Sequence, residues 1–295
     1  IVPGHLDPQI GLHRTDAPTT TCLAVFIISI LAVSFGWWGK IFDVNGAFLS
    51  GKPMERECYV RAPKDGLPAV DGHARIKPYS LLRLLKAAYG LQEAPRLWYL
   101  QLVEILEEIG FEEIKIGRAT FVLYAYGENG EKELVGMLAV HVDDGIVFGN
   151  HMHPVYELAR KKLNDKLNIK KWKSLKQGQQ GYLGMQWSQS PTSIVVSMRE
   201  YMDKLEVVKL TDAQKETADK APGTLIPEEL RFEYKSVHAK VRWPVAHVMP
   251  AFAYRVSKAS QKSRENLTYE DVMILNDLVQ DVRECADDHG CQLKF

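Results

Sequence analysis

The sequence predicts an α+β fold. Apolar runs of strand length alternate with helical patterns over the first 190 residues, and a hairpin pattern, "ELVGMLAVHVDDGIVFG", lies in their middle. The last hundred residues are more helical and more polar. We therefore expect two modules, residues 1–190 and residues 191–295.

Composition is that of a globular chain. Hydrophobic residues make up 46% and charged residues 25% of the 295 positions, which excludes a disordered tail. Lys plus Arg equals Asp plus Glu at 37 each, so any nucleic-acid binding must rest on local charge. The four cysteines are too scattered for a disulfide framework and favour a reducing compartment.

The first residues, "IVPGHLDPQI", contain neither an initiator Met nor the basic start of a secretory signal. We expect an internal fragment of a longer, non-secreted protein. Residues 23–38 form an apolar stretch that as a helix would cover ~24 Å, short of a ~30 Å hydrocarbon core. This stretch predicts a helix buried in protein, and we expect no membrane partner.

The next elements are short strands around turns. "KIFD" is a strand that ends at Asp43 and is followed by a glycine-containing turn, and "CYVRAP" is a second strand. Residues 63–78 are rich in turn formers. A helix is predicted from Pro95, which suits a first turn, to Gly110, which suits a helix end.

The hairpin region follows this helix. "TFVLYAY" and "ELVGMLAVHV" are predicted strands separated by the turn "GENGEK", and "GIVFG" is the return strand. "VYELARKKLNDKL" is an amphipathic helix. Residues 160–176 carry eight basic residues and one acid, which fits a solvated helix face, with nucleic-acid contact as the alternative.

Two adjacent carboxylates, Asp143 and Asp144, interrupt the apolar hairpin. The Asp-Gly pair fits the positive-φ positions of a hairpin turn, so a plain turn is one interpretation. Asp43, at the end of another strand, supplies a third carboxylate. Three such groups together would repel unless hard cations lay among them, and an oxygen-only set favours Mg²⁺. Paired Mg²⁺ ions serve phosphoryl and nucleotidyl transfer.

Several blocks, taken together, resemble the reverse transcriptases of copia-type LTR retrotransposons. The corresponding family patterns are DVKTAFLNG…IYM.QP, LKKSLYGLKQAPRQWY, LYVDDML..G, FLGMEI and RPDIAYAVSxLSQ. The match follows the family's order and spacing over essentially the whole chain. The blocks read "FDVNGAFLSGKPMERECYVRAP", "LLRLLKAAYGLQEAPRLWY", "LAVHVDDGIVFG", "YLGMQW" and "MPAFAYRVSKASQ".

The resemblance implies a right-hand polymerase fold. Residues 1–190 would form truncated fingers and the palm, an antiparallel sheet with packed helices. Residues 191–295 would form a thumb- or connection-like helical segment that leads toward a missing RNase H domain. The implied activity is RNA-directed DNA polymerisation by two-metal nucleotidyl transfer to a primer 3′-OH.

The resemblance also implies roles for particular residues. Two Mg²⁺ ions, or Mn²⁺, would be held by a carboxylate triad and one backbone carbonyl. Other positions would contact the incoming nucleotide and template, with an aromatic ring that crowds the sugar 2′ position, and a hairpin would hold the primer end. The triad is Asp43, Asp143 and Asp144 with the Val44 carbonyl; the nucleotide positions are Phe48, Tyr89 and Gly90; the primer hairpin is Tyr182, Leu183, Gly184 and Met185.

The implied partners are an RNA template, a DNA primer and dNTPs, together with the integrase and RNase H of the intact Pol polyprotein. Such an element carries out DNA integration and resides in cytoplasmic virus-like particles, the nucleus, or both. Three departures from the family pattern leave an alternative open, a catalytically dead remnant that at most binds nucleic acid. They are His141 in place of Tyr, "DVNGAF" in place of DVKTAF, and the missing basic fingers segment.

Other motifs are weaker. Cys285, His289 and Cys291 have metal-like spacing, but no C-x-x-C partner completes a zinc site. His151 and His153 are a weaker pair of the same kind. The sequence contains no glycine-rich phosphate loop, dinucleotide fingerprint or nucleophile elbow, which argues against kinases, dehydrogenases and serine hydrolases.

Overall fold

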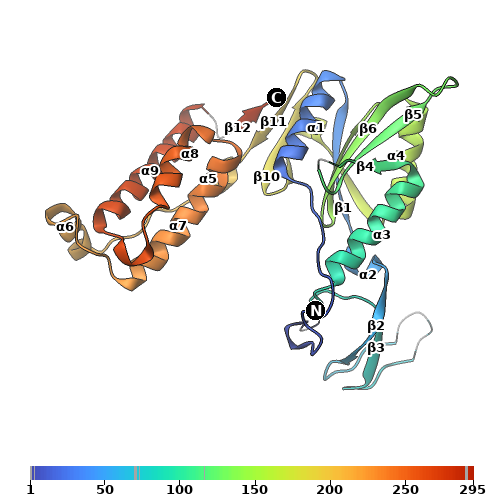
Figure 1. Ribbon diagram of the computed structural model, residues 1–295, viewed down its shortest axis with the longest axis horizontal. Coiled ribbons are helices and arrows are strands. Elements are labelled where there is room, and N and C mark those ends of the chain that lie inside the picture. The colour runs from blue at the N-terminus through green and yellow to red at the C-terminus, as the bar shows by residue number, and fades with distance from the viewer. Residues whose placement is uncertain (1, 3, 70–71, 73, 116, 290–291) are drawn as a thin grey trace. The chain divides into compact units, whose positions relative to one another are not determined.

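The computed structural model describes residues 2, 4–69, 72, 74–115, 117–289 and 292–295. The chain divides into two compact units, Ile1–Ser174 and Leu175–Phe295. Both units combine helices with antiparallel strands, so the predicted α+β class is confirmed (Figure 1). Residue 190, the expected module boundary, lies in the second unit at the end of a strand.

A six-stranded antiparallel sheet forms the centre of the first unit; four of its strands match expected segments, whereas the two strands at its edges were not expected. The hairpin pattern produces β6 and β7, and the "KIFD" strand inserts between β7 and the last strand. The order is β4 (Phe111–Glu113), β5 (Thr120–Tyr126), β6 (Lys132–His141), β7 (Asp144–Gly149), β1 (Trp38–Val44) and β8 (Ile169–Ser174).

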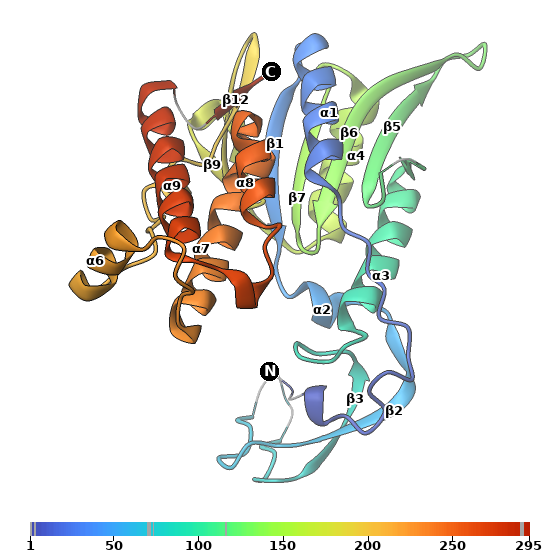
Figure 2. The same ribbon diagram turned by 60° about the vertical axis from the view of Figure 1, so that its left-hand side comes forward.

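Helices cover both faces of this sheet (Figures 1 and 2). α3 (Ala94–Ile109) and α4 (Pro154–Lys166) share one hydrophobic core with alternate side chains of β1, β6 and β7. α1 (Cys22–Ser34) contacts the same strands from the other face. A sheet buried on both faces needs apolar residues at consecutive positions, which explains the unbroken apolar runs of β6 and β7.

The apolar helix is shorter than expected and only half buried. α1 ends at Ser34, and Trp38 already belongs to β1. Val25 and Ile28 are buried against the sheet, whereas Leu23 and Ile27 are exposed, so the expected helix packs in the protein with one face only. Within the part of the chain that the structure describes, no helix combines the length and the apolar character needed to cross a membrane.

Three glycines allow aromatic rings to lie directly on the sheet. A Cβ at Gly145 would lie 2.2 Å from the ring of Phe42. Gly136 and Gly149 are Cα partners, and a Cβ at either would meet the ring of Tyr156 at 2.9 and 2.1 Å. The glycines of "GIVFG" are therefore packing residues, because any side chain there would displace a core aromatic.

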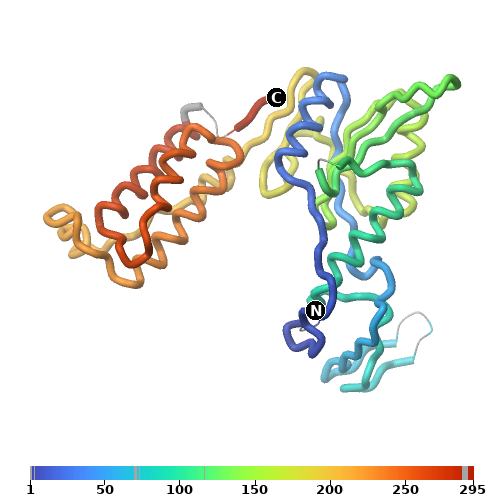
Figure 3. The backbone as a smooth tube through the Cα atoms, in the orientation of Figure 1, coloured from blue at the N-terminus to red at the C-terminus, as the bar shows by residue number. Residues whose placement is uncertain are grey.

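A smaller substructure completes the first unit. β2 (Pro53–Arg61) and β3 (Leu81–Lys86) form a two-stranded sheet, joined to β1 by α2 (Ala47–Ser50). The N-terminal segment, with the 3-10 turn η1 (Gly4–Leu6), lies beside this pair before the chain runs past α3 to α1 (Figure 3).

The second unit contains a four-stranded sheet and a group of helices. β9 and β10 belong to the expected "YLGMQW" hairpin, whereas β11 and β12 were not expected. The strand order is β12 (Gln292–Lys294), β11 (Ser193–Ser197), β10 (Met185–Ser190) and β9 (Gln180–Tyr182). The helices are α5 (Arg199–Met202), α6 (Asp212–Lys220), α7 (Glu228–His247), α8 (Ala253–Ala259) and α9 (Tyr269–His289), with 3-10 turns η2 (Leu175–Gln177), η3 (Pro250–Phe252) and η4 (Arg264–Asn266).

The basic run of residues 160–176 is not one helix face. Its first part lies on α4, but Ile169–Ser174 is the edge strand β8. Trp172 anchors this strand, because its ring packs on Phe42 with centroids 5.0 Å apart. The sequence pattern did not distinguish this strand from a helix, because lysines are common on exposed edge strands as well as on solvated helix faces.

Candidate active site

Asp43 and Asp144 face each other across β1 and β7 as Cα partners. Asp144 is also the Cα partner of His141 on β6, so the three side chains form a row over three strands. Directly opposed residues in antiparallel strands project from the same face of a sheet. Both carboxylates are exposed. The row therefore presents negative charge to solvent at one end of the central sheet.

Asp143 lies in the turn beside this row. The turn residues are Val142 and Asp143, because His141 and Asp144 are already paired. Val142 has φ of 62°, a conformation that usually requires glycine in a two-residue hairpin. The expected Asp-Gly turn is thus wrong, and Gly145 lies in the strand, where Phe42 needs the space.

Two hydrogen bonds fix the backbone around the carboxylates. The amide of Val44 donates to the carbonyl oxygen of Asp143 at 3.0 Å, which ties the turn to β1. The indole N–H of Trp98 donates to the carbonyl oxygen of Val142 at 2.6 Å. In addition, the register of β1 against β8 shifts between Phe42 and Val44, which is the bulge-like irregularity often found beside active sites.

The carboxylates repel one another. Partial burial and the charges of Asp143 and Asp43 raise the pKa of Asp144, while Lys173 and His141 act in the opposite direction. Among the described residues, none forms a hydrogen bond or ion pair with any of the three carboxylates. Acidic groups this close together disfavour one another's ionised form, and a bound cation would offset that repulsion.

The donor set fits a hard divalent cation. Carboxylate oxygens are the ligands that Mg²⁺ prefers, and three are available within two paired strand ends. In the described part of the chain, no three Asp, Glu, His or Cys side chains converge as a ready-made metal cluster. Cation binding here therefore requires the side chains to rotate toward one another, which their mutual repulsion opposes until the cation arrives.

The expected nucleotide residues form a second group. Phe48 lies on α2, four residues beyond Val44, and Tyr89 lies in the loop before α3. Their rings are in contact, with centroids 4.8 Å apart. Gly90 has φ of 106°, which a side chain would strain, so the loop beside Tyr89 depends on this glycine. The structure thus brings Phe48 and Tyr89 together from distant parts of the sequence.

The expected primer-holding residues form a tight hairpin in the second unit. Tyr182 and Met185 are Cα partners at the ends of β9 and β10. Leu183 and Gly184 between them have φ of 52° and 71°, as in a type I′ turn. Tyr182 and Met185 are buried, so the turn residues are the accessible part of this hairpin.

The weaker histidine motif has a structural role. His153 is the N-cap of α4, where its ring accepts a hydrogen bond from the amide of Val155, and the His151 ring contacts Glu157 at 3.2 Å. In the Cys285, His289 and Cys291 set, Cys285 is a free half-buried thiol on α9. The His289 side chain and Cys291 lie outside the described residues.

Sequence reasoning missed two contributors to the site. Trp98 positions the turn, and Lys173 on β8 opposes the rise in the Asp144 pKa. Trp98 lies in a recognised block and on the predicted helix, but nothing in its spacing indicates a partner 44 residues away. Lys173 was counted only as part of a basic run.

Comparisons with known proteins place these features in a family. Residues 7–221, more than half of the chain, match the family described as "Reverse transcriptase (RNA-dependent DNA polymerase)". The chain is 28% identical over 263 residues to the retrovirus-related Pol polyprotein from transposon RE1 of Arabidopsis thaliana, which covers 86% of this chain and 16% of that protein. It is 27% identical over 263 residues to the polyprotein from transposon RE2 of the same plant, covering 86% of this chain and 17% of that protein. The chain thus spans about a sixth of the length of these curated relatives.

Proposed function

Because the chain belongs to the reverse transcriptase (RNA-dependent DNA polymerase) family, we propose that it is the RNA-directed DNA polymerase domain of a copia-type retrotransposon. Family membership confirms the resemblance seen in the sequence blocks. The proposal goes further, because it assigns an activity and a site to this particular chain.

One observation carries the assignment. Asp43 and Asp144 are opposed across β1 and β7, and Asp143 is held beside them by the Val44 amide. Two sequence blocks a hundred residues apart thus supply three carboxylates to one end of one sheet. Acidic groups that repel without a cation, at a solvent-facing strand end, favour a cation-dependent site over a structural turn.

The chain's own residues have distinct tasks in this proposal. Asp43, Asp143 and Asp144, with the Val44 carbonyl, would hold Mg²⁺. When bound, this ion would supply activation of the primer 3′-OH and neutralisation of charge on the transferred phosphate. Asp144 must be ionised for this task, and the charge of Lys173 favours its ionisation. The indole of Trp98 keeps the turn that carries Asp143 in one position.

Phe48 and Tyr89 select the nucleotide in this account. Their rings are in contact, Phe48 from α2, close in sequence to Asp43, and Tyr89 from the loop before α3, and the Phe48 ring is partly accessible. An aromatic ring against the sugar would clash with a 2′-OH and would favour dNTPs over ribonucleotides. Gly90 gives the template and nucleotide close access to the backbone.

The remaining assignments follow the family pattern. The six-stranded sheet with α3 and α4 corresponds to a palm, and β2 with β3 to the fingers. The hairpin of residues 182–185 would hold the primer, and the helices of the second unit would serve as thumb and connection. RNA template, DNA primer and dNTPs are the proposed partners, with integrase and RNase H elsewhere in the same element.

Primer extension tests this function. The native chain, Mg²⁺, dNTPs and an oligo(dT)-primed RNA template would be compared with an Asp143→Asn, Asp144→Asn double variant. We expect extension by the native chain alone. Addition of ribonucleotides should give no product with the native chain, and Phe48→Ala should accept them.

The alternative is a remnant that keeps the fold without activity, and His141 in the acidic row is the observation that favours it. Absence of extension by the native chain and by His141→Tyr, with retained binding of the primed template, would support that alternative. Recovery of extension in His141→Tyr would instead identify this histidine as the cause of low activity.

A further inference from the structure

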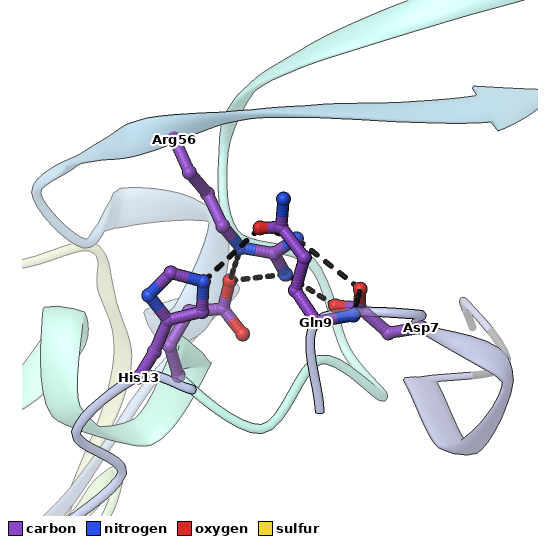
Figure 4. Close-up of polar contacts among 5 residues, drawn as sticks. Asp7, Gln9, His13 and Arg56 are labelled. Atoms are coloured by element: carbon purple, nitrogen blue, oxygen red, sulfur yellow. Dashed lines mark hydrogen bonds and ion pairs between the residues drawn. The ribbon is translucent and has the colours of Figure 1, made fainter. Parts of the chain in front are cut away.

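Arg56 on β2 joins two parts of the first unit that are distant in sequence. Its Nε donates to the carboxylate of Glu93 at 2.7 Å, and its terminal nitrogens bind the carboxylate of Asp7. Glu93 is the N-cap residue of α3, whereas Asp7 belongs to the N-terminal segment. Figure 4 shows the guanidinium of Arg56 beside the carboxylate of Asp7, with Gln9 and His13 nearby.

This cluster is almost closed to solvent. The side chains of Arg56 and Asp7 are each 12% exposed, and that of Glu93 is 11% exposed. Hydrogen bonds from Arg56 lower the pKa of Asp7 despite the opposing effect of burial. One guanidinium therefore compensates two carboxylates, and removal of Arg56 would leave both charges desolvated and facing each other.

The N-terminal segment adds its own links around Arg56. The side-chain oxygen of Gln9 accepts a hydrogen bond from Arg56 at 3.3 Å, and the backbone amide of Gln9 donates to the carboxylate of Asp7 at 3.0 Å. The ring of His13 contacts the same Gln9 oxygen at 3.1 Å. Bidentate guanidinium–carboxylate geometry is specific in direction, so this segment is held in one orientation.

The same segment contacts the loop that carries Tyr89. The amide of Val2 donates to the carbonyl oxygen of Tyr89 at 2.7 Å. Gly4 lies so close to Gly90 that a Cβ there would be 1.8 Å from the Gly90 carbonyl oxygen. Tyr89 and Gly90 therefore have the N-terminal segment against their backbone, and the Tyr89 ring rests on Phe48.

We propose that Arg56 is a positioning residue for nucleotide binding: by joining Asp7 to Glu93, it holds Val2 and residues 4–13 as a strap against the loop of residues 89–93, and so keeps the Tyr89 ring on Phe48. The nucleotide part of this inference rests on the proposed function. The strap itself does not, since it follows from the contacts of Arg56, Val2 and Gly4.

Hydrogen exchange and nucleotide binding in the full-length chain test the strap. Arg56→Met removes the charge and keeps much of the apolar stem, and Arg56→Lys keeps the charge without the fork. Asp7→Asn weakens the strap at its other end and leaves Arg56 with Glu93. Arg199→Met is the matched control, because Arg199 is also held by two carboxylates, Asp203 and Asp287, in the second unit.

Amide exchange would be followed in peptides that cover residues 2–13 and 88–93. We expect faster exchange in both peptides for Arg56→Met and Asp7→Asn, a smaller change for Arg56→Lys, and none for the control. In primer extension, we expect Arg56→Met to raise KM for dTTP about tenfold, which corresponds to ~1.4 kcal/mol, with a much smaller change in kcat.

Three results would overturn the proposal in different ways. Unchanged exchange in Arg56→Met and Asp7→Asn would show that no strap exists. Faster exchange with an unchanged KM for dTTP would show that the strap does not position nucleotide. A native chain that neither binds Mg²⁺–dTTP in equilibrium dialysis nor extends a primer would refute the nucleotide role together with the proposed function, while the exchange result would still decide the strap.

Discussion

Trp98 donates its indole N–H to the carbonyl oxygen of Val142 over 2.6 Å, and this bond connects the core helix α3 to the turn that carries Asp143. Val142 is β-branched and has φ of 62°, which costs on the order of 1 kcal/mol or more in a non-glycine residue. The strained turn persists because the buried indole and the Val44 amide both hold it. Strain of this kind is characteristic of functional sites.

Loss of the indole donor should therefore damage the turn more than the core. Trp98→Phe keeps most of the aromatic volume but leaves the Val142 carbonyl without this partner, and we expect a loss of about 1–3 kcal/mol of unfolding free energy. Urea unfolding measures this loss. Val142→Gly in the Trp98→Phe background should recover part of it, because glycine adopts positive φ freely. If Val142→Gly recovers none of the lost unfolding free energy, Trp98 does not act by offsetting the backbone strain at Val142.

Gly145 should tolerate no side chain while Phe42 is present. A Cβ at this position would lie 2.2 Å from the Phe42 ring, so Gly145→Ala must displace a core aromatic next to Asp43. We expect a cost of about 2–4 kcal/mol in thermal or urea unfolding. In a Phe42→Leu background, where the side chain opposite Gly145 is shorter, Gly145→Ala should lower the unfolding free energy less. Additive effects of the two substitutions would contradict this packing argument.

Tyr156 should be more stable as phenylalanine. Its hydroxyl is buried and has no hydrogen-bond partner among the described residues, while its ring covers Gly136 and Gly149. Burial also raises the pKa of this phenol, so it stays neutral at ordinary pH. Tyr156→Phe removes an unsatisfied polar atom and keeps the ring, so we expect about 1 kcal/mol of added stability. A loss of stability in urea unfolding would indicate an ordered water that binds the hydroxyl.

Glu157 should make stability depend on acid pH. Hydrogen bonds from Arg160 and from His151 lower its pKa from 4.5 to about 2. A carboxylate with a depressed folded-state pKa stabilises the fold above its unfolded pKa, and this contribution is lost as pH falls from 4.5 toward 2. Because Glu157 is partly exposed, Glu157→Gln should cost only about 1 kcal/mol at neutral pH. Unfolding curves of native and variant proteins should converge at low pH, and a difference independent of pH would contradict this assignment.

Much of the first unit was predictable because local pattern and tertiary packing agree there. The strand at residues 120–126, the helix that begins near Pro95 and the hairpin of β6 and β7 all appear where periodicity and turn residues place them. β8 was missed because its lysines resemble a solvated helix face, and Trp172 reveals its role only through contact with Phe42. β12 was missed because its sheet partner β11 lies almost a hundred residues away.

Part of the candidate site was likewise predictable from the sequence, and part was not. Two recognised blocks predicted that Asp43 and Asp144 lie at neighbouring strand ends, and the two residues are Cα partners. Phe48 and Tyr89 are in contact, and their nucleotide role stays a prediction. The turn was assigned to the wrong residues, because Gly145 signals a turn in the sequence while it actually makes room for Phe42. The Arg56 cluster had no sequence signal, since its partners are 49 and 37 residues away.

Asp43, Asp143 and Asp144 should repel one another until a divalent cation binds among them. Thermal unfolding of the native chain and of Asp144→Asn, each in EDTA and in Mg²⁺, measures this repulsion and its relief. We expect Asp144→Asn to have the higher Tm in EDTA, because one repelling charge is gone, and Mg²⁺ to raise the Tm of the native chain much more than that of the variant. Equal responses to Mg²⁺, or a variant less stable than the native chain in EDTA, would contradict the account.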